Sequence, residues 1–259
     1  MEDRWTLADL NYHEALREQA RLAGGTVHEE AGMTFTLGPH PHPVANTAFR
    51  TLSSAPARTL VERALAFYAE HRHSFGLLTR DHPADSDLAE AARRCGLVPM
   101  ATPPEMIATS RIGEKPPPPD SEFRRVADRA TLGDFAEVAG RAWATYGVPP
   151  EVPRLLFVRE ESLGFPHVFA VVGYWRGEPV SGALAVLSHG IAGVYWVSTV
   201  PEARGRGFGE AATRWVTNAA FDAGARWVSL QASPMGEKIY RRMGFVEIGR
   251  YRLFLGPEL

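Results

Sequence analysis

The most informative stretch of this 259-residue sequence is Val197-Ser198-Thr199-Val200-Pro201-Glu202-Ala203-Arg204-Gly205-Arg206-Gly207-Phe208-Gly209-Glu210. It predicts a strand that enters a proline-bearing turn, then a loop rich in arginine and glycine, then the start of a helix. The three glycines let the backbone approach a ligand closely. The first N–H groups of the helix have no partner within it and carry partial positive charge, to which the two arginines add. The stretch therefore predicts a pyrophosphate-binding loop.

The spacing of these glycines differs from two other phosphate-binding patterns. A P-loop requires G-x-x-x-x-G-K-[ST], and no Lys-Ser or Lys-Thr pair follows this loop. A dinucleotide-binding loop requires G-x-G-x-x-G at the start of a βαβ unit, whereas this chain has G-x-G-x-G after hairpin strands. A plain Arg-Gly surface turn stays open as an alternative if the loop is considered alone.

The residues around the loop predict an α+β fold, a mixed sheet flanked by helices. Before the loop we expect strands at 123–126, 167–175, 180–187 and 193–200, and helices at 131–143, capped by Thr131, and 152–163. After it we expect a helix at 209–223, a strand at 226–231, a short helix opened by Ser233-Pro234 and closed by Gly244, and a final strand or strand pair at 246–255.

Four consecutive prolines mark the clearest boundary, within Lys115–Asp120. We expect a linker at 115–120 between one domain at 1–114 and another at 121–259. The first domain repeats the later element order in weaker form, and 88–98 and 238–246 both end in Gly, an apolar residue and Val. This similarity predicts an internal duplication, hence two tandem copies of one fold.

Two motifs at the right separation resemble the GNAT superfamily of acyl-CoA N-acyltransferases. Arg204, Gly207 and Gly209 match its phosphate motif Q/R-x-x-G-x-G/A, and Tyr240-Arg241-Arg242-Met243-Gly244-Phe245 matches its "Tyr, three residues, Gly-Phe" ending. The resemblance covers about 123–255. It implies transfer of an acetyl group from acetyl-CoA, the common donor of the family, to an amine of a small molecule or peptide.

The resemblance also implies the roles of individual residues. Backbone groups of Val197, Ser198 and Thr199 would pair with the pantetheine arm like an added strand. Tyr240 would serve the departing thiolate, because a phenol can donate a proton or a hydrogen bond to that anion. Ser233 stands where the family often has Asn, which puts that contact in doubt. The remaining residues expected to bind the cofactor are Arg204, Gly205, Arg206, Gly207, Phe208, Gly209 and Glu210.

No residue can be named as general base. The strand before the loop holds no carboxylate or histidine, and the helix dipole alone explains an acid at Glu210. His189, Glu160 and Glu161 each have a simpler interpretation as solvated surface. The N-terminal half has a proline and Cβ-bearing residues at 53–58, Ser53-Ser54-Ala55-Pro56-Ala57-Arg58, where the duplication would place a glycine loop. We therefore expect it to be a degenerate copy without its own cofactor, which shapes the acceptor cleft or the packing.

Composition restricts the partners. The formal net charge is −2 and neither half carries a basic tract, so we expect no nucleic-acid partner. The N-terminus resembles no secretory signal and no apolar run could span a bilayer, so we expect a cytoplasmic protein without membrane contact. Cys95 is the single cysteine, and the histidine pairs lack metal-ligand spacing, so we expect neither a disulfide nor a metal. A homodimer is left open.

Two functions of other classes are weighed against an acetyltransferase. The absence of an obvious base favours a non-catalytic acyl-CoA-binding regulatory module. A nucleotide-binding oxidoreductase is disfavoured by the glycine spacing.

Overall fold

The computed structural model describes residues 3–52, 54–157, 159–160 and 165–258. It divides into two compact units: unit 1 is Met1–Ala15 with Glu105–Ile248, and unit 2 is Leu16–Pro104 with Gly249–Leu259. This division differs from the expected boundary at 115–120, because each unit takes a strand from the far side of the proline segment. Helix α1 (Arg4–Leu22) also contributes residues to both units. Sequence periodicity along the chain could not reveal this exchange.

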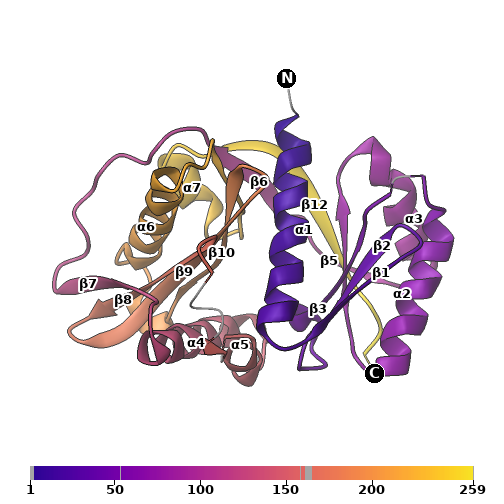
Figure 1. The fold of residues 1–259 in the computed structure, drawn as a ribbon, viewed down its shortest axis with the longest axis horizontal. Helices are drawn as coiled ribbons and strands as arrows, with labels where there is room; N and C mark the ends of the chain where they lie inside the picture. Colours follow the sequence, from indigo (N-terminus) through magenta and orange to yellow (C-terminus); the bar gives the residue numbers. More distant parts are fainter. Residues whose placement is uncertain (1–2, 53, 158, 161–164, 259) are drawn as a thin grey trace. The chain divides into compact units, whose positions relative to one another are not determined.

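Unit 1 contains a mixed sheet with the strand order β6-β11-β10-β9-β8-β7 (Figure 1). The strands are β6 (Pro104–Ala108), β7 (Ser121–Arg125), β8 (Val168–Trp175), β9 (Glu178–Ser188), β10 (Ile191–Thr199) and β11 (Val228–Gln231). Strands β10 and β11 run parallel, and the other neighbours are antiparallel. The exchanged strand β6 closes the sheet at β11, which is why residues before the prolines belong to this unit.

The helices of unit 1 cover its sheet and supply the core. They are the first part of α1, α4 (Arg129–Trp143), α5 (Glu151–Leu156), α6 (Phe208–Asp222) and α7 (Glu237–Arg242), with 3-10 turns η3 (Ala144–Tyr146) and η5 (Pro201–Ala203). The α6 side chains at helical spacing, Ala212, Val216 and Ala220, are fully buried against Val194 and Leu230 of the sheet. This packing fixes where the N-terminus of α6 lies.

Three expected helix boundaries were wrong or incomplete. Asp128, not Thr131, caps α4: its side chain accepts from the Thr131 N–H at 2.8 Å in a capping box. Helix α7 begins at Glu237, because the backbone after Ser233 first forms a turn in which Gly236 N donates to Ser233 O at 2.9 Å. Helix α5 ends at Leu156, and the expected end at Leu163 lies outside the described residues.

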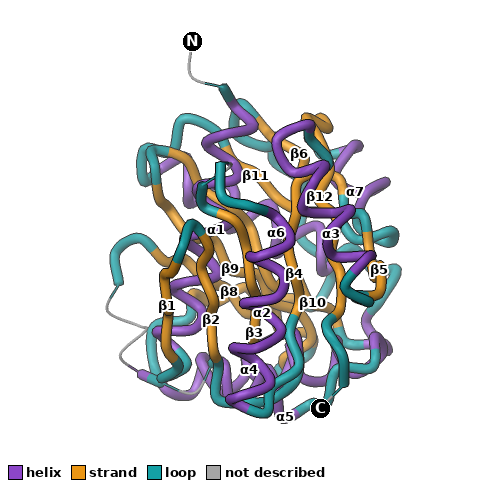
Figure 2. Tube along the Cα trace, turned by 90° about the vertical axis from the view of Figure 1, so that its right-hand side faces the viewer, coloured by secondary structure: helices purple, strands orange, loops and turns teal. Residues whose placement is uncertain are grey.

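Unit 2 contains a second mixed sheet with the order β1-β2-β3-β4-β12, and β5 also pairs with β12 (Figure 2). Its strands are β1 (Thr26–Glu30), β2 (Met33–Leu37), β3 (Asn46–Arg50), β4 (Gly76–Arg80), β5 (Val98–Ala101) and β12 (Val246–Leu255). Its helices are the rest of α1, α2 (Ala57–His71) and α3 (Ser86–Arg94), with 3-10 turns η1 (Pro43–Ala45) and η2 (Pro83–Asp85). The sequence patterns did not reveal α1, β1 or β5.

The two units repeat one arrangement, which confirms the internal duplication. In unit 2 the parallel strands β3 and β4 are joined through α2 and followed by α3, as β10 and β11 are joined through α6 and followed by α7. Both final helices end on a glycine in the left-handed region, Gly96 at φ 84° and Gly244 at φ 96°. In each case the residue after the glycine donates its backbone N–H to a carbonyl of the helix. Leu97 N donates to Ala92 O and Phe245 N donates to Tyr240 O, both at 3.0 Å.

Candidate active site

A wedge opens in the sheet of unit 1 where β10 and β11 separate. The two strands pair only from Ala192 to Val194 of β10. Just beyond, β10 is irregular, and Trp196 has a φ of +53°. In the described structure, Ser198 and Thr199 pair with β9 on one side, and Val197–Thr199 have no strand partner on the side of β11. Their backbone groups are therefore open to an extended ligand.

A pocket of about 700 Å³ lies at this wedge. All twelve residues expected to form the site line it: Val197, Ser198, Thr199, Arg204, Gly205, Arg206, Gly207, Phe208, Gly209, Glu210, Ser233 and Tyr240. They come from the end of β10, the glycine loop, the start of α6 and the region of α7. Tertiary folding thus brings together two motifs that lie some thirty residues apart in the sequence.

The glycine loop has the backbone conformation that its composition predicts. Gly205 and Gly207 have φ values of 75° and 87°, and Gly207 is the N-cap of α6. A Cβ at Gly209 would lie 3.0 Å from Thr199 Oγ1, so glycine there lets the helix start close to the strand. The first α-helical bond runs from Ala211 N to Gly207 O at 3.0 Å, which leaves the earlier N–H groups of the helix without an intrahelical partner. This is the geometry of an anion site.

The two loop arginines differ in their contacts. Arg204 turns inward: its guanidinium donates to Thr199 O at 3.1 Å, Ala142 O at 3.1 Å and Thr145 Oγ1 at 2.8 Å. It therefore holds the loop against the ends of β10 and α4. Arg206 is exposed, and its guanidinium carbon lies 4.5 Å from the centre of the Trp175 ring.

The pocket is lined by five basic side chains and one acidic one, although the whole chain has a net charge of −2. Glu210 is paired on both sides, with Lys115 Nζ at 3.0 Å and Arg214 Nη2 at 2.6 Å. Because its carboxylate is engaged by two cations, Glu210 is not free to act as a base; it holds Lys115 and Arg214 in place. Sequence reasoning missed the basic residues Lys115 and Arg214, which lie outside both motifs, and Arg242, which is one of the three variable residues of the second motif. The positive lining suits an anionic ligand.

Tyr240 lies buried beside the glycine-lined turn before α7. Its ring occupies the space at Gly236, where a Cβ would come within 2.6 Å of Tyr240 Cε2. Burial raises the pKa of Tyr240 to about 12, and a hydrogen bond with Thr213 opposes this shift. The phenol is therefore protonated at neutral pH and can donate. Ser233 is exposed, and its Oγ accepts from Gly236 N at 3.2 Å, so its hydroxyl helps to form the turn.

Aromatic residues and prolines that the sequence analysis did not assign to the site complete the pocket wall. Trp143 and Tyr146 line it, and Trp143 Nε1 donates to Ser198 Oγ at 3.1 Å. Pro116–Pro119 also line it, so the expected linker is part of unit 1 and of the site. Their place at the pocket follows from the exchange of β6, which no local pattern indicates.

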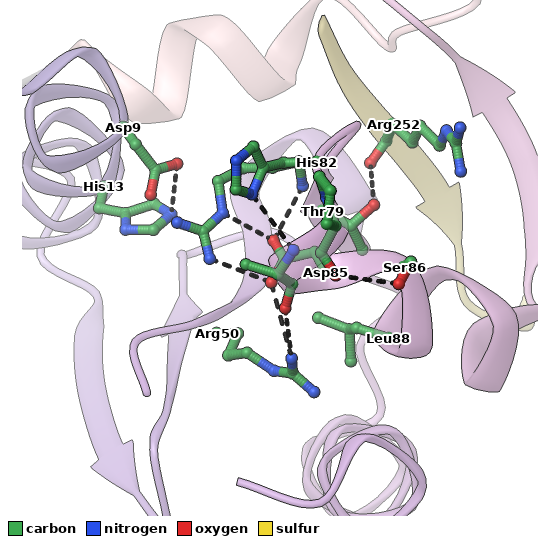
Figure 3. A network of polar contacts seen from close by, with 12 residues as sticks. Asp9, His13, Arg50, Thr79, His82, Asp85, Ser86, Leu88 and Arg252 are labelled. Carbon is green, nitrogen blue, oxygen red and sulfur yellow. Dashed lines mark hydrogen bonds and ion pairs between the residues drawn. The ribbon is translucent and has the colours of Figure 1, made fainter. Parts of the chain in front are cut away.

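Unit 2 has an ion network where unit 1 has the pocket. Arg50, the last residue of β3, has a side chain that is 1% exposed, and it lies 3.7 Å from the buried carboxylate of Asp85 (Figure 3). It also donates to both Asp87 oxygens at 2.9 Å and to Ala55 O at 3.2 Å, which joins the β3–α2 loop to the start of α3. Ala57 opens α2 after Pro56, with no side-chain cap. Ser53, part of the expected degenerate loop, lies outside the described residues.

Among the base candidates that the structure describes, Glu210 lines the pocket and His189 and Glu160 do not. His189 is exposed in a turn with φ 54°, and Glu160 lies 3.5 Å from Arg129. Glu161 lies outside the described residues. Across the described ranges, no group of three or more His, Cys, Asp and Glu side chains is arranged to hold a metal ion. In the same ranges no helix has the length and apolarity needed to cross a membrane.

Comparison with known proteins was informative at the level of structure. No protein-family model matches the sequence, and no curated protein matches it. A GCN5-related N-acetyltransferase from Kribbella flavida is similar in structure, with a TM-score of 0.68, 20% identity and coverage of 96% of this chain and 95% of that one. A GCN5-related N-acetyltransferase-like protein from Streptococcus suis has a TM-score of 0.58 and 14% identity, with coverage of 94% of this chain and 99% of that one. A tandem GNAT protein from the clavulanic acid biosynthesis pathway has a TM-score of 0.57 and 13% identity, with coverage of 87% of this chain and 79% of that one.

The chain therefore has the fold of the GCN5-related N-acetyltransferases, the GNAT fold, as its two motifs predict. Within that fold class it has the tandem arrangement, with one copy in each unit.

Proposed function

We propose that the protein transfers an acetyl group from acetyl-CoA to an amine of a small molecule or peptide. One observation carries this proposal: a single pocket combines an open strand edge, a helix N-terminus with free N–H groups and a buried, protonated phenol. Each of these three features suits a different part of an acyl-CoA. The low-identity structural neighbours support the same chemistry.

The donor would be held along β10 and the glycine loop. The open edge of Val197–Thr199 offers backbone hydrogen bonds to the two amides of a pantetheine arm. The N–H groups at Gly205–Glu210 and the dipole of the 15-residue α6 would hold the pyrophosphate. Arg206 and Arg242 are exposed at the rim and add positive charge for the phosphates.

Tyr240 would stabilise the thiolate that leaves when the amine attacks the thioester carbonyl. A free thiol has a pKa of about 8.5, roughly three to four units below the pKa of about 12 of this phenol. Complete proton transfer to the thiolate is therefore uphill, whereas a strong hydrogen bond to it is favourable. Tyr240 thus acts chiefly as a hydrogen-bond donor to the developing anion, an interaction that strengthens in the transition state.

Two measurements test the proposal. Calorimetry with acetyl-CoA, CoA and NADH should show binding of the first two and none of NADH. A thiol-release assay with acetyl-CoA over a panel of amines should then show turnover with at least one. Binding without turnover on any amine would favour a non-catalytic acyl-CoA-binding module, and NADH binding alone would contradict an acyl-CoA site.

A further inference from the structure

A second pocket, of about 400 Å³, adjoins the first in unit 1. The residues that line both pockets are Lys115, Glu210, Arg214 and Arg242. The rest of the second pocket is lined by Ile112, Gly113, Glu114 and Met243. It borders α6 at Glu210 and Arg214, which are four residues apart on one face of the helix. A donor whose pyrophosphate lies at the glycine loop therefore reaches this second pocket with its nucleotide end.

One wall of the second pocket belongs to residues 111–120, the strap, which runs between β6 and β7 (Figure 1). Asn218 of α6 holds the start of the strap: its Oδ1 accepts from Ile112 N at 2.8 Å, and its Nδ2 donates to Ile112 O at 3.0 Å. Ser121 holds the other end, because its Oγ donates to Pro118 O at 2.5 Å. Four prolines between these anchors restrict the backbone further. The strap is therefore a fixed part of the pocket wall.

The second pocket has more cationic than anionic side chains. Lys115 and Arg214 both contact the Glu210 carboxylate, at 3.0 Å and 2.6 Å. Arg242, in the last turn of α7, is exposed and has no hydrogen-bond or ion-pair partner among the described residues. The second acid of the lining, Glu114, is exposed as well. The pocket thus offers three cations against two anions, and the guanidinium of Arg242 is available to a ligand.

This lining suits a phosphate monoester attached to an aromatic base. Such a phosphate carries a charge of about −1.5 to −2 at pH 7, and a guanidinium can donate two parallel N–H bonds to it. Beside the cations the wall is apolar at Ile112 and Met243, which suits the face of a purine. CoA has one phosphate monoester, the 3′-phosphate of its adenosine, and its diphosphate connects that nucleotide to the pantetheine arm.

We propose that the second pocket binds the 3′-phosphate of the donor, and that Arg242, with Lys115 and Arg214, makes the protein selective for the 3′-phosphorylated form of CoA. This inference rests on the acyl transfer proposed above. The strand edge and the glycine loop face parts that CoA shares with dephospho-CoA, so they cannot distinguish the two. The selectivity comes instead from the strap, the second turn of α6 and the end of α7.

The test compares the dissociation constants of acetyl-CoA and acetyl-dephospho-CoA, which differ only in the 3′-phosphate. Calorimetry on the wild type should show acetyl-CoA binding about 10–100-fold more tightly, the range expected for hydrogen bonds to a charged group. Arg242→Gln should weaken acetyl-CoA binding about tenfold and leave acetyl-dephospho-CoA binding unchanged. The preference for acetyl-CoA should therefore fall by the same factor. Because Arg242 is exposed, the variant should keep wild-type stability, which a denaturation curve checks.

Arg241→Gln is the matched control. It removes the same charge from the neighbouring position of α7, but Arg241 lies outside the described lining of both pockets. Its guanidinium donates instead to Glu237 at 2.8 Å and to Glu247 at 2.7 Å. This variant should therefore keep the wild-type preference for acetyl-CoA.

Three outcomes would overturn the inference while the transferase proposal stands. The first is equal affinity of the wild type for the two donors. The second is a loss in Arg242→Gln that is equal for both donors, and the third is the same loss of preference in Arg241→Gln, which would reduce the effect to net charge. Wild-type protein that binds neither donor would instead overturn the proposed function.

Discussion

A buried phenol that keeps its proton at neutral pH can stabilise a departing thiolate, and Tyr240 meets both conditions. Tyr240→Phe keeps the ring that packs over Gly236, so acetyl-CoA affinity and stability should stay near wild type. Turnover should fall by about 10²-fold or more, in kcat and kcat/KM alike, because the hydrogen bond strengthens only in the transition state. Steady-state kinetics beside a denaturation curve measures both effects.

Other outcomes for Tyr240→Phe have distinct interpretations. A loss of about 1 kcal/mol in the free energy of unfolding with unchanged turnover would assign the hydroxyl a structural hydrogen bond. Full turnover with full stability would reduce Tyr240 to a packing residue.

Gly207 combines a left-handed backbone with a position at the phosphate end of the pocket. A carboxylate in Gly207→Glu should abolish acetyl-CoA binding, since two like charges about 4 Å apart near a protein surface repel by about 4 kcal/mol, roughly 10³-fold in affinity. Gly207→Ala is the matched control: its Cβ meets only Pro118 Cγ at 3.9 Å, so it shares the backbone strain without the charge. Calorimetry on both folded variants separates the two effects, and equal affinity in the Glu variant contradicts the site.

Glu105 affects stability in a pH-dependent way. Its pKa rises from 4.5 to about 8 on folding, so the folded protein holds a proton that the unfolded chain releases between these values. Burial of the Glu105 carboxyl therefore costs the wild type no free energy of unfolding below pH 4.5, where both states are protonated. The full cost applies above pH 8, where both states are ionised. Glu105→Gln removes the ionisable group, so it should gain stability relative to wild type as pH rises from 5 to 9, by on the order of 5 kcal/mol at most. Urea denaturation at both pH values checks this, and a pH-independent difference contradicts it.

At the level of elements, the same strand–helix junction has opposite uses in the two units. After β10, three glycines allow the backbone to approach a ligand and α6 presents free N–H groups. After β3, the Arg50 guanidinium fills the corresponding place and bonds to carbonyl and carboxylate groups on both sides of it. We propose that a cation already neutralised by protein groups leaves no site for a phosphate at this junction.

This contrast predicts a stability effect confined to unit 2. Arg50→Met should lower the free energy of unfolding by about 3 kcal/mol, the lower end for breaking a buried ion pair, because Asp85 keeps Arg80 as a partner at 2.8 Å. Arg58→Met is the control, since its pair with Glu62 is exposed and should contribute under about 0.5 kcal/mol. Similar losses in both variants would contradict a structural role for the Arg50 network.

At the level of the whole molecule, the two copies differ at the strand–helix junction: described residues of unit 1 line a pocket there, whereas in unit 2 Arg50 bonds to protein groups. We predict one CoA bound per chain, held by residues of unit 1, since every pocket-lining residue belongs to that unit. Calorimetric titration should saturate at one ligand per chain in the wild type and show none in Gly207→Glu. Saturation at two would mean that the Arg50 network opens to admit a second ligand.

The sequence alone determined the features that depend on local chemistry. A glycine loop after a strand, and helix stops of the form Gly, apolar residue, Val, have few backbone solutions, so the loop geometry and the duplication could be predicted from them. The resemblance of two motifs predicted the GNAT fold, and it named twelve residues that the structure gathers around one pocket. Tertiary structure decided everything that depends on residues distant in the chain. It placed the prolines and Lys115 at the pocket, exchanged strands between the units, and set Glu105 opposite Gln231, 126 residues away. Strand pairing is chosen by backbone hydrogen bonds and burial across the sheet, and those carry no signal in neighbouring residues.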